Sequence, residues 1–353
     1  MSAPTVYDVA EQAGVSIATV SRVYRSPDSV RAQTRERVLS SARELGYVPS
    51  GNARGLASRS TGVLGLCYPD FHDSEADSAP EADPGEVTLY SDEVIRGMER
   101  AARRHGYALL IAAAHADDAG TRLAEVASRV DGLAVLAQSM PDEALDMVAR
   151  RLPVTLLAGH RAQGLDHVQV ANFDGLLEVT RHLLTTHRLQ RLAFIGGPPD
   201  SPDGEARFRG FQAAHLEADL PLPEHPDARG DLTQAAGRKA VEELFGAPGP
   251  GPRPQGLVFA NDQMAVGALH ALDARGISVP GDLAVTGFDG IPLSSLVRPT
   301  LTTVRQPMGQ LGVAAVELLV ARLEQRDRPT EARVLPVSAT YRESCGCPPG
   351  PAA

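Results

Sequence analysis

The first two dozen residues constrain the fold more than any other segment, because they carry the spacing of two short helices joined by a sharp turn. Thr5 is placed to cap the first helix. Gly14 follows that helix and can adopt a positive φ, so it can end the helix in a tight turn. Between them, four apolar residues recur at i, i+3, i+4 and i+7, on one helical face: Val6, Val9, Ala10 and Ala13.

A second helix follows, with Ser16 as its expected cap and with Val20 and Val23 pointing inward beside Val15. Two helices joined by a short turn that contains glycine form a helix-turn-helix. The alternative interpretation is a helix hairpin that binds nothing. The side chains on the outer face are short, apart from one guanidinium, and such a set fits a DNA major groove: Ile17, Ala18, Ser21 and Arg22.

The distribution of charge favours the DNA-binding interpretation. Residues 1–60 contain eight arginines and five acidic residues, a balance of +3, while the whole chain carries −10, so the remainder carries −13. A basic head on an acidic body is expected when a nucleic-acid-binding module is joined to another domain. An acidic body also disfavours nonspecific adhesion to DNA.

Length and apolar pattern predict a cytoplasmic protein of two or three domains. The 353 residues include no apolar run of about eighteen residues and no signal-like leader, so we expect neither a membrane span nor secretion. Cys67 is expected in the core. Cys345 and Cys347 are too closely spaced for an easy disulfide or a zinc pair, and we expect them to lack partners and any metal or redox role.

A third helix is expected over residues 32–45, ended by Gly46. The segment 47–62 that follows is polar, is interrupted by proline and glycine, and contains one apolar residue of exposed character, Leu56. This composition predicts a linker, or a short helix too weak to persist alone.

Beyond residue 62, short strand-like runs alternate with helical segments. The expected strands span residues 63–67, 109–112, 132–136, 154–157, 168–170, 192–195, 257–260 and 283–286. The expected helices span residues 92–105, 175–186, 205–217, 234–245, 263–275 and 310–325. This alternation predicts a doubly wound parallel α/β fold in two lobes, whose ligands bind beyond the carboxyl ends of the strands.

Two segments interrupt the alternation. Residues 70–88 are acidic and rich in Ala, Pro and Ser, and we expect a mobile loop there. Residues 246–254 form a Pro/Gly connector. The chain contains no dinucleotide-binding glycine fingerprint and no Walker A motif, and the pair Gly196 and Gly197 is typical of any βα turn. We therefore expect no cofactor.

Several motifs recur in a fixed order along nearly the whole chain. The head reads Y-D-V-A-E-x-A-G-V-S-x-x-T-V-S-R-V. Further motifs are T-R-E-R-V at 34–38, E-L-G-Y-x-P at 44–49, A-R-G-L at 53–56, G-G-P at 196–198, R-F-R-G-F at 207–211, A-N-D-Q-M-A at 260–265, V-T-G-F-D at 285–289 and P-T-L-T-T-V-R-Q-P at 299–307. The order and spacing of these motifs resemble those of the LacI/GalR family of bacterial transcription regulators.

The resemblance implies a DNA-binding headpiece over residues 1–48, a hinge over 49–61 and a two-lobed core of the periplasmic-binding-protein type over 62–345. It places the chain crossings between lobes near residues 171, 304 and 333, and leaves 346–353 as a disordered tail. Arg31 stands where the family usually has a serine cap, and we expect its cation to reach a phosphate. The DNA-contacting residues that the resemblance implies are Thr5, Tyr7, Ser16, Ile17, Ala18, Thr19, Ser21, Arg22, Arg31, Thr34, Ala53 and Leu56.

Leu56 matches the family's hinge residue that wedges into the minor groove at the operator centre. An apolar wedge unstacks a base step, and the resulting bend brings more protein surface to the duplex. Gly51 and Gly55 weaken this hinge as a helix by about 1 kcal/mol each relative to Ala, so we expect it to order only on DNA.

Effector ligands carry over from the family at Arg207, Asn261 and Asp289, with His160 and Tyr90 as further candidates. A guanidinium, an amide and a carboxylate that converge can together bind adjacent hydroxyls. The alternative is that Asn261 only caps the following helix and that Asp289 only caps a turn. Family members usually stack aromatic rings on a sugar, but at the matching positions this chain has Leu232 and Met308.

The leading hypothesis is a repressor whose operator affinity is set by a small metabolite, most plausibly a carbohydrate. A pseudo-palindromic operator and a homodimer are expected, because no leucine heptads of the kind that hold some members as tetramers follow Tyr341. The rivals are a solute-binding protein, which would need an export signal and would lack the head, and an α/β enzyme, for which no nucleophile–base pair or metal cluster is seen.

Overall fold

The computed structural model describes residues 4–48, 60–69, 89–114, 119–136, 142–159, 164–199, 201–246 and 252–348. The chain divides into two compact units, Met1–Gly62 and Val63–Ala353. Residues 49–59 of the expected hinge, the acidic segment 70–88 and most of the Pro/Gly connector lie outside the described residues.

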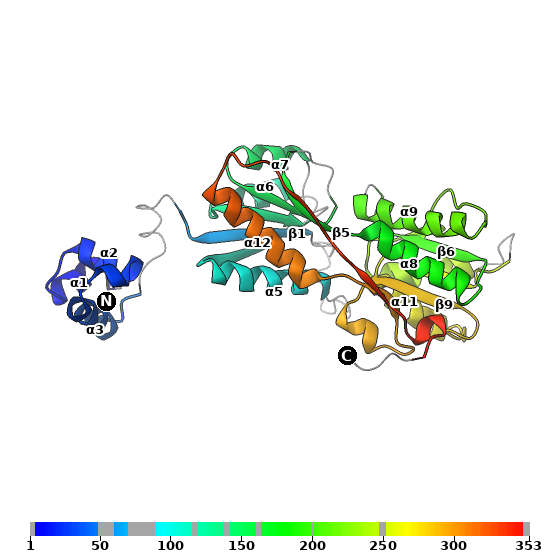
Figure 1. Cartoon of the computed structure of the whole chain (residues 1–353). Helices are drawn as coiled ribbons and strands as arrows, with labels where there is room; N and C mark the ends of the chain where they lie inside the picture. The colour runs from blue at the N-terminus through cyan, green and yellow to red at the C-terminus, as the bar shows by residue number, and fades with distance from the viewer. Residues whose placement is uncertain are drawn as a thin grey trace. The chain divides into compact units, whose positions relative to one another are not determined.

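The first unit consists of α1 (Val6–Gln12), α2 (Ile17–Arg25), a 3₁₀ turn (Pro27–Ser29) and α3 (Ala32–Leu45) (Figure 1). Gly14 joins α1 to α2 with a φ of 61°, and Gly46 ends α3 with a φ of 67°. The apolar residues expected to point inward form one cluster: Val9, Ala10, Ala13, Val20, Val23, Val38 and Ala42. The helix-turn-helix that the sequence predicts is thereby confirmed.

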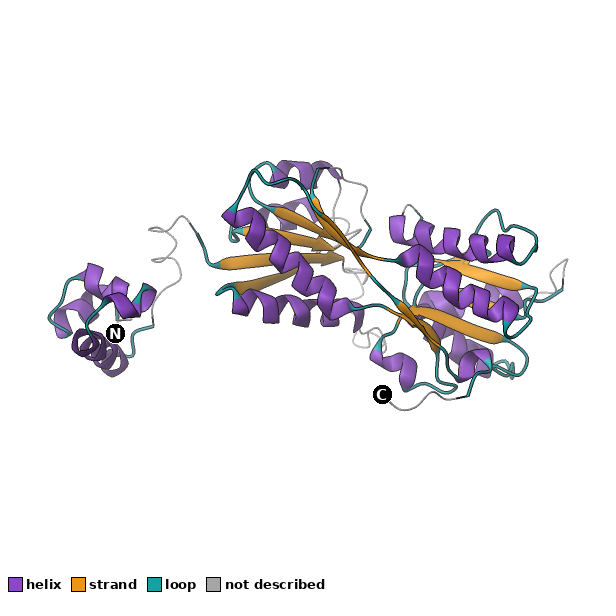
Figure 2. Cartoon of the chain, viewed as in Figure 1, coloured by secondary structure: helices purple, strands orange, loops and turns teal. Residues whose placement is uncertain are grey.

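The second unit contains two six-stranded sheets, each at the centre of one lobe (Figure 2). The first-lobe sheet has the order β11-β5-β4-β3-β1-β2 and is parallel throughout. Its strands are β1 (Val63–Pro69), β2 (Ala108–Ala114), β3 (Gly132–Leu136), β4 (Val154–Leu157), β5 (Asp166–Val170) and β11 (Ala332–Leu335).

The second-lobe sheet has the order β12-β10-β9-β8-β6-β7, in which only the edge strand β12 is antiparallel to its neighbour. Its strands are β6 (Leu192–Gly196), β7 (Ala228–Arg229), β8 (Gly256–Phe259), β9 (Ala284–Asp289), β10 (Thr302–Arg305) and β12 (Ser338–Thr340). The two doubly wound lobes confirm the fold class expected from the sequence.

Helices cover both faces of each sheet, in pairs. In the first lobe, α5 (Leu89–Arg104) pairs with α12 (Met308–Glu324), and α6 (Ala119–Ala127) packs beside α7 (Asp142–Ala149) on the opposite face (Figure 1). In the second lobe, the pairs are α8 (Asn172–Thr185) with α9 (Pro202–Glu217), and α10 (Gln234–Phe245) with α11 (Asp262–Asp273).

The chain passes between the lobes three times. The first crossing lies at residue 171, between β5 and α8, as expected. The expected crossings at 304 and 333 fall inside β10 and β11, and the chain changes lobe a few residues later, at 306–307 and 336–337. No strand was expected at either place, so the sequence offered no strand end from which to locate the crossing. Each crossing includes a proline, Pro307 or Pro336, which cannot donate to a ladder.

The helix pairs approach so closely that glycine is required at their contacts. A Cβ on Gly97 of α5 would lie 2.0 Å from the carbonyl oxygen of Gly309 in α12. A Cβ on Gly237 of α10 would lie 1.9 Å from the Met264 carbonyl oxygen in α11. Between α8 and α9, Gly210 has the same role against the Phe173 carbonyl oxygen, at 2.3 Å. Backbone-to-backbone contact thus fixes the spacing of these pairs.

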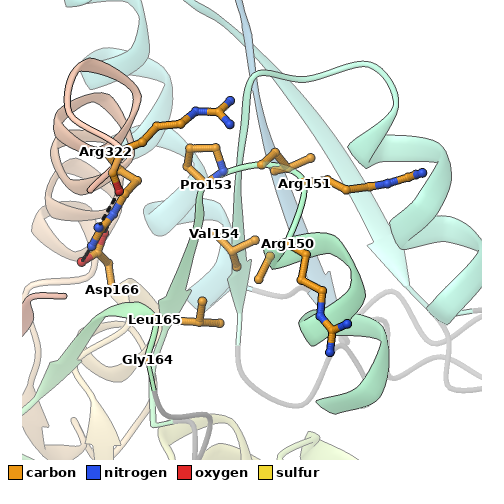
Figure 3. A pocket seen from close by; sticks show the side chains of 11 residues that line it. Arg150, Arg151, Pro153, Val154, Gly164, Leu165, Asp166 and Arg322 are labelled. Carbon is orange, nitrogen blue, oxygen red and sulfur yellow. Dashed lines mark hydrogen bonds and ion pairs between the residues drawn. The ribbon is translucent and has the colours of Figure 1, made fainter. Parts of the chain in front are cut away.

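A buried carboxylate ties the connection between α12 and β11 to the first-lobe sheet. Asp166 is 1% exposed and receives both Nε and Nη2 of Arg322, at 3.1 and 2.9 Å (Figure 3). Arg328 Nη2 donates to the same carboxylate at 2.8 Å, as does the Glu331 backbone N–H, also at 2.8 Å. A pocket of about 210 Å³ opens beside this cluster, where Figure 3 shows Arg150 pointing away from Asp166.

We predict that Gly97→Ala destabilises the protein by about 1–3 kcal/mol, because the added methyl must push α5 away from the α12 backbone. Gly120→Ala is the matched control, since a Cβ at that helical glycine meets nothing within 4 Å. The control should be neutral or stabilising by up to about 1 kcal/mol. Denaturant unfolding of both variants checks this, and equal effects would contradict the close-contact explanation.

Candidate functional site

The outer face of α2 is largely exposed. Ile17 is 41% exposed, Ala18 and Arg22 are exposed, and Ser21 is half-buried. Tyr7 on α1 is 67% exposed. The structure therefore presents the side chains predicted for base contacts on the surface of the headpiece, held by a core from all three helices.

Hydrogen bonds organise the helix starts of the headpiece. The Ser16 hydroxyl accepts from the Thr19 backbone N–H at 3.2 Å and shares a further bond with the Thr19 hydroxyl at 3.0 Å. Asp8 accepts from both the backbone N–H and the hydroxyl of Thr5, at 2.6 and 2.7 Å, and these bonds lower the pKa of Asp8. The first turns are thereby fixed, and helix N-termini attract phosphate.

The other residues expected to contact DNA lie at the start of α3 or in the hinge. Arg31 occupies the N-cap of α3, is exposed and makes no side-chain cap bond, and Thr34 is half-buried in the first turn of the same helix. Ala53 and Leu56 of the hinge lie outside the described residues, as does His160 among the effector candidates.

A polar cluster forms where the carboxyl ends of the strands from both lobes meet. Asp289 ends β9, Ala260 follows β8, Asn172 follows β5, and Gly159 follows β4. We refer to Asn172, Asp203, Arg207 and Asp289 as the interlobe cluster. Its position agrees with the expectation that ligands of such folds lie beyond the carboxyl ends of the strands.

Arg207 is the cation of the interlobe cluster and is 8% exposed. Its Nε donates to Asn172 Oδ1 at 2.8 Å, and its Nη1 donates to the Ala260 carbonyl oxygen at 2.6 Å. Its guanidinium carbon lies 3.9 Å from the centre of the Phe288 ring, a cation–π contact. Among the described residues these bonds use the Nε proton and one Nη1 proton, which leaves both Nη2 protons and the second Nη1 proton as donors.

Asp289 supplies a carboxylate beside that cation. Its Oδ1 lies 3.7 Å from Arg207 Nη1 and accepts from Gln306 Nε2 at 2.6 Å. Burial raises the pKa of Asp289 to about 6, although Arg207 acts to lower it. Its φ of 118° is rare for a residue with a side chain. The strained turn is held by Asp262, which accepts from the backbone N–H of Gly290 and of Ile291 at 2.8 and 3.0 Å.

Asn261 caps α11 in the manner of the alternative interpretation. Its Oδ1 accepts from the Met264 backbone N–H at 3.0 Å, and its Nδ2 donates to the Leu232 carbonyl oxygen at 2.9 Å. Both ends of the amide are therefore engaged. A role for Asn261 in effector binding stays a prediction, and it would use the second Nδ2 proton or the second lone pair of Oδ1.

Asp203 and Asn172 were not singled out from the sequence. Asp203 Oδ1 accepts from Asn172 Nδ2 and from the Gly159 backbone N–H, both at 2.8 Å. Because Gly159 belongs to the first lobe and α9 to the second, this carboxylate bridges the two lobes. The available signal was local, an aspartate in the first turn of a helix that begins with Ser201 and Pro202.

Tyr90 and the two substituted aromatic positions complete the surroundings. Tyr90 lies near the start of α5, and burial together with Asp203 and Asp289 raises its pKa, so the phenol stays a donor. Leu232 has a φ of 76° and is half-buried, and Met308 is 7% exposed. Met308 also borders a pocket of about 590 Å³ that includes Gly290 and Gln306.

The expectation that Cys345 and Cys347 lack partners is wrong. The fold places them beside His182 and His187, which lie about 160 residues earlier in the chain. Gly346 and Cys347 belong to the tail expected over 346–353, and Cys347 is half-buried with its Sγ 3.3 and 3.4 Å from the two histidine Nε2 atoms. Residues that are distant in sequence but adjacent in space leave no spacing signature.

Known proteins match both units. The model of bacterial regulatory proteins of the lacI family matches residues 5–50, and that of the periplasmic binding protein-like domain matches residues 180–345. The transcriptional repressor CytR of Escherichia coli is 31% identical, over 97% of this chain and 96% of its own length. The chain belongs to the LacI family. Catabolite control protein A of Priestia megaterium is 29% identical over 96% of the chain and 98% of its length.

Solved structures agree with this membership. The lac repressor dimer bound to operator and the anti-inducer ONPF superposes with a TM-score of 0.80 at 25% identity, over 98% of this chain and 99% of that one. This LacI-family chain is accordingly a DNA-binding transcription regulator, in keeping with the transcriptional repressor CytR. Within the described residues, no helix is long and apolar enough to cross a membrane.

We predict a pH-dependent stability difference between the wild type and Asp289→Asn. The native carboxyl binds a proton below about pH 6, while an unfolded one does so only near its ordinary pKa of 3.8. Between pH 3.8 and about pH 6 the folded state therefore holds more protons than the unfolded state. The free energy of unfolding of the wild type falls as pH rises through this window, by roughly 2–3 kcal/mol relative to the variant. Denaturant unfolding at several pH values measures this, with exposed Asp273→Asn as control. A pH-independent difference would contradict the burial effect.

Proposed function

We propose that this LacI-family regulator is a repressor whose affinity for its operator is controlled by a small metabolite bound at the interlobe cluster. The observation that carries the proposal is the buried pair of Arg207 and Asp289, which lie with Nη1 and Oδ1 3.7 Å apart where the two lobes meet. A ligand that contacts both lobes can stabilise one arrangement of the lobes relative to another. Such differential binding is what shifts a conformational equilibrium.

The headpiece is proposed to read DNA with the exposed face of α2. Arg22 suits a guanine edge, and Ile17 and Ala18 suit thymine methyl groups. Two headpieces in a homodimer fit a pseudo-palindromic operator. The lac repressor structure that matches this chain is a dimer bound to operator, which supports this arrangement.

The proposed effector is a small polyhydroxylated or acidic metabolite, with a carbohydrate as the leading class. Carboxylate, guanidinium and phenol groups at one place can bind adjacent hydroxyls. With Leu232 and Met308 where rings usually stack, polar contacts carry more of the recognition, which disfavours a large disaccharide. Solved relatives include a regulator with cellobiose and one with ribose, at 28% and 23% identity.

Two rival functions have less support. A solute-binding protein would have the same two lobes, but the headpiece that matches the lacI family would have no role in such a protein. For an α/β enzyme, the buried acidic groups of the interlobe cluster are already paired with Arg207, Asn172 and Gln306. A thermal-shift screen against sugars and sugar acids tests the proposal, since a ligand at 100 times its Kd stabilises by about 2.7 kcal/mol.

Arg22→Ala should weaken operator binding by roughly 1–3 kcal/mol and relax specificity at one base pair in each half-site, because a bidentate guanine contact is lost. Gel shifts on the operator and on random duplexes of equal length measure this. An equal loss on both DNAs would reassign Arg22 to phosphate contact.

Arg207→Ala should abolish the response to the effector while operator binding persists, because the variant changes the second unit and leaves the headpiece intact. Arg209→Ala is the matched control, an exposed arginine on the same helix. Calorimetry with monosaccharides, disaccharides and sugar acids, followed by gel shifts with and without ligand, gives the readout. Tight binding of a disaccharide that survives Arg207→Ala would refute both the site and the ligand class.

A further inference from the structure

Four metal-ligating side chains converge in the second lobe, away from the interlobe cluster. His182 lies in the last turn of α8, and His187 follows that helix. Cys345 ends a 3₁₀ turn (Glu343–Cys345), and Cys347 lies just beyond it. One ligand atom from each of the four lies within 4.8 Å of the others.

The distances within this cluster match the edges of a tetrahedron around one metal ion. Zinc bonds of about 2.05 Å to nitrogen and 2.3 Å to sulfur imply N···N edges near 3.3 Å and N···S edges near 3.6 Å. The His182 and His187 Nε2 atoms are 3.0 Å apart. Cys347 Sγ lies 3.3 and 3.4 Å from these nitrogens, and Cys345 Sγ lies 3.9 Å from His182 Nε2.

Hydrogen bonding accounts for this arrangement poorly. His182 Nε2 has three neighbours within 3.9 Å, namely His187 Nε2 and both sulfurs. A ring nitrogen carries either one proton or one lone pair, so it can satisfy one such neighbour well. A central cation takes one lone pair from each ligand, so all four are satisfied together.

The surroundings hold the ligands in place. The Tyr341 ring stacks on His182 with centroids 3.9 Å apart, and its hydroxyl donates to Glu178 Oε1 at 3.3 Å. Gly346 adopts a φ of 95°, which lets the chain turn between the two cysteines. Ser344 ties the segment to the sheet, because its hydroxyl donates to the Val285 carbonyl oxygen at 2.6 Å and accepts from the Thr302 backbone N–H at 2.8 Å.

We propose that His182, His187, Cys345 and Cys347 bind one Zn²⁺ ion in a tetrahedral site that fastens the C-terminal segment to the end of α8. Two thiolates and two imidazoles at tetrahedral spacing are a donor set typical of zinc. With four protein ligands the site is closed and structural, with no open position for catalysis.

Metal content of the full-length protein is the first test. The protein is expressed with zinc, freed of any affinity tag, and compared with Cys347→Ser, His187→Ala and Cys67→Ala. Cys67 is a buried cysteine outside the cluster and serves as the control. We expect about one zinc per chain in the wild type and in Cys67→Ala. We expect at least a tenfold loss in the two ligand variants.

Cobalt substitution and chelation provide the second test. Co²⁺ in the zinc-depleted wild type should give the intense visible bands of tetrahedral geometry and a thiolate charge-transfer band, and Cys347→Ser should lose most of the latter. A strong chelator should lower the thermal midpoint of the wild type and of Cys67→Ala, but leave Cys347→Ser unmoved. A wild type that binds neither ion after reconstitution, a Cys345–Cys347 disulfide in its place, or zinc retained in both ligand variants would overturn the site.

Discussion

A guanidinium is costly to bury without partners, and Arg207 obtains its partners from parts of the chain that are far apart in sequence. Asn172 opens α8, Ala260 follows β8, and Phe288 and Asp289 end β9. If any of these groups moved, the Arg207 guanidinium would lose one of its partners. The position of this one side chain therefore fixes how the ends of three elements meet, and through Asn172 it also fixes Asp203.

The same region stores strain. Asp289 keeps a φ of 118°, and the carboxylate of Asp262 compensates by receiving the two following backbone N–H groups and the Thr303 hydroxyl. Asp262 is fully buried and its pKa is raised well above the usual range, chiefly by that burial. Strained residues persist where the surroundings over-determine them, and such positions are frequent at binding sites.

Much of this fold could be predicted from the sequence, because its signals are local. Helical spacing located α1 to α3, and short, mainly apolar runs bounded by turns located β3 and β4 at their observed ends. The strands β7, β10, β11 and β12 were missed, since two to four residues carry too little pattern. The cluster of Cys345 and Cys347 with His182 and His187 could not be predicted, because its members meet only through the topology.

The bridging carboxylate of Asp203 has a consequence for how the lobes can move. Three connections at 171, 306–307 and 336–337 join the lobes, so sliding one lobe past the other would stretch all three, while a rotation about them needs only small torsional changes. Rotation is therefore the easier of these two relative motions. Asp203 couples it to the orientation of Arg207, because its Oδ1 holds both the Gly159 N–H of one lobe and the Asn172 amide of the other. A ligand that competes for Asn172 or Arg207 therefore also changes which rotation of the lobes about these three connections is favoured.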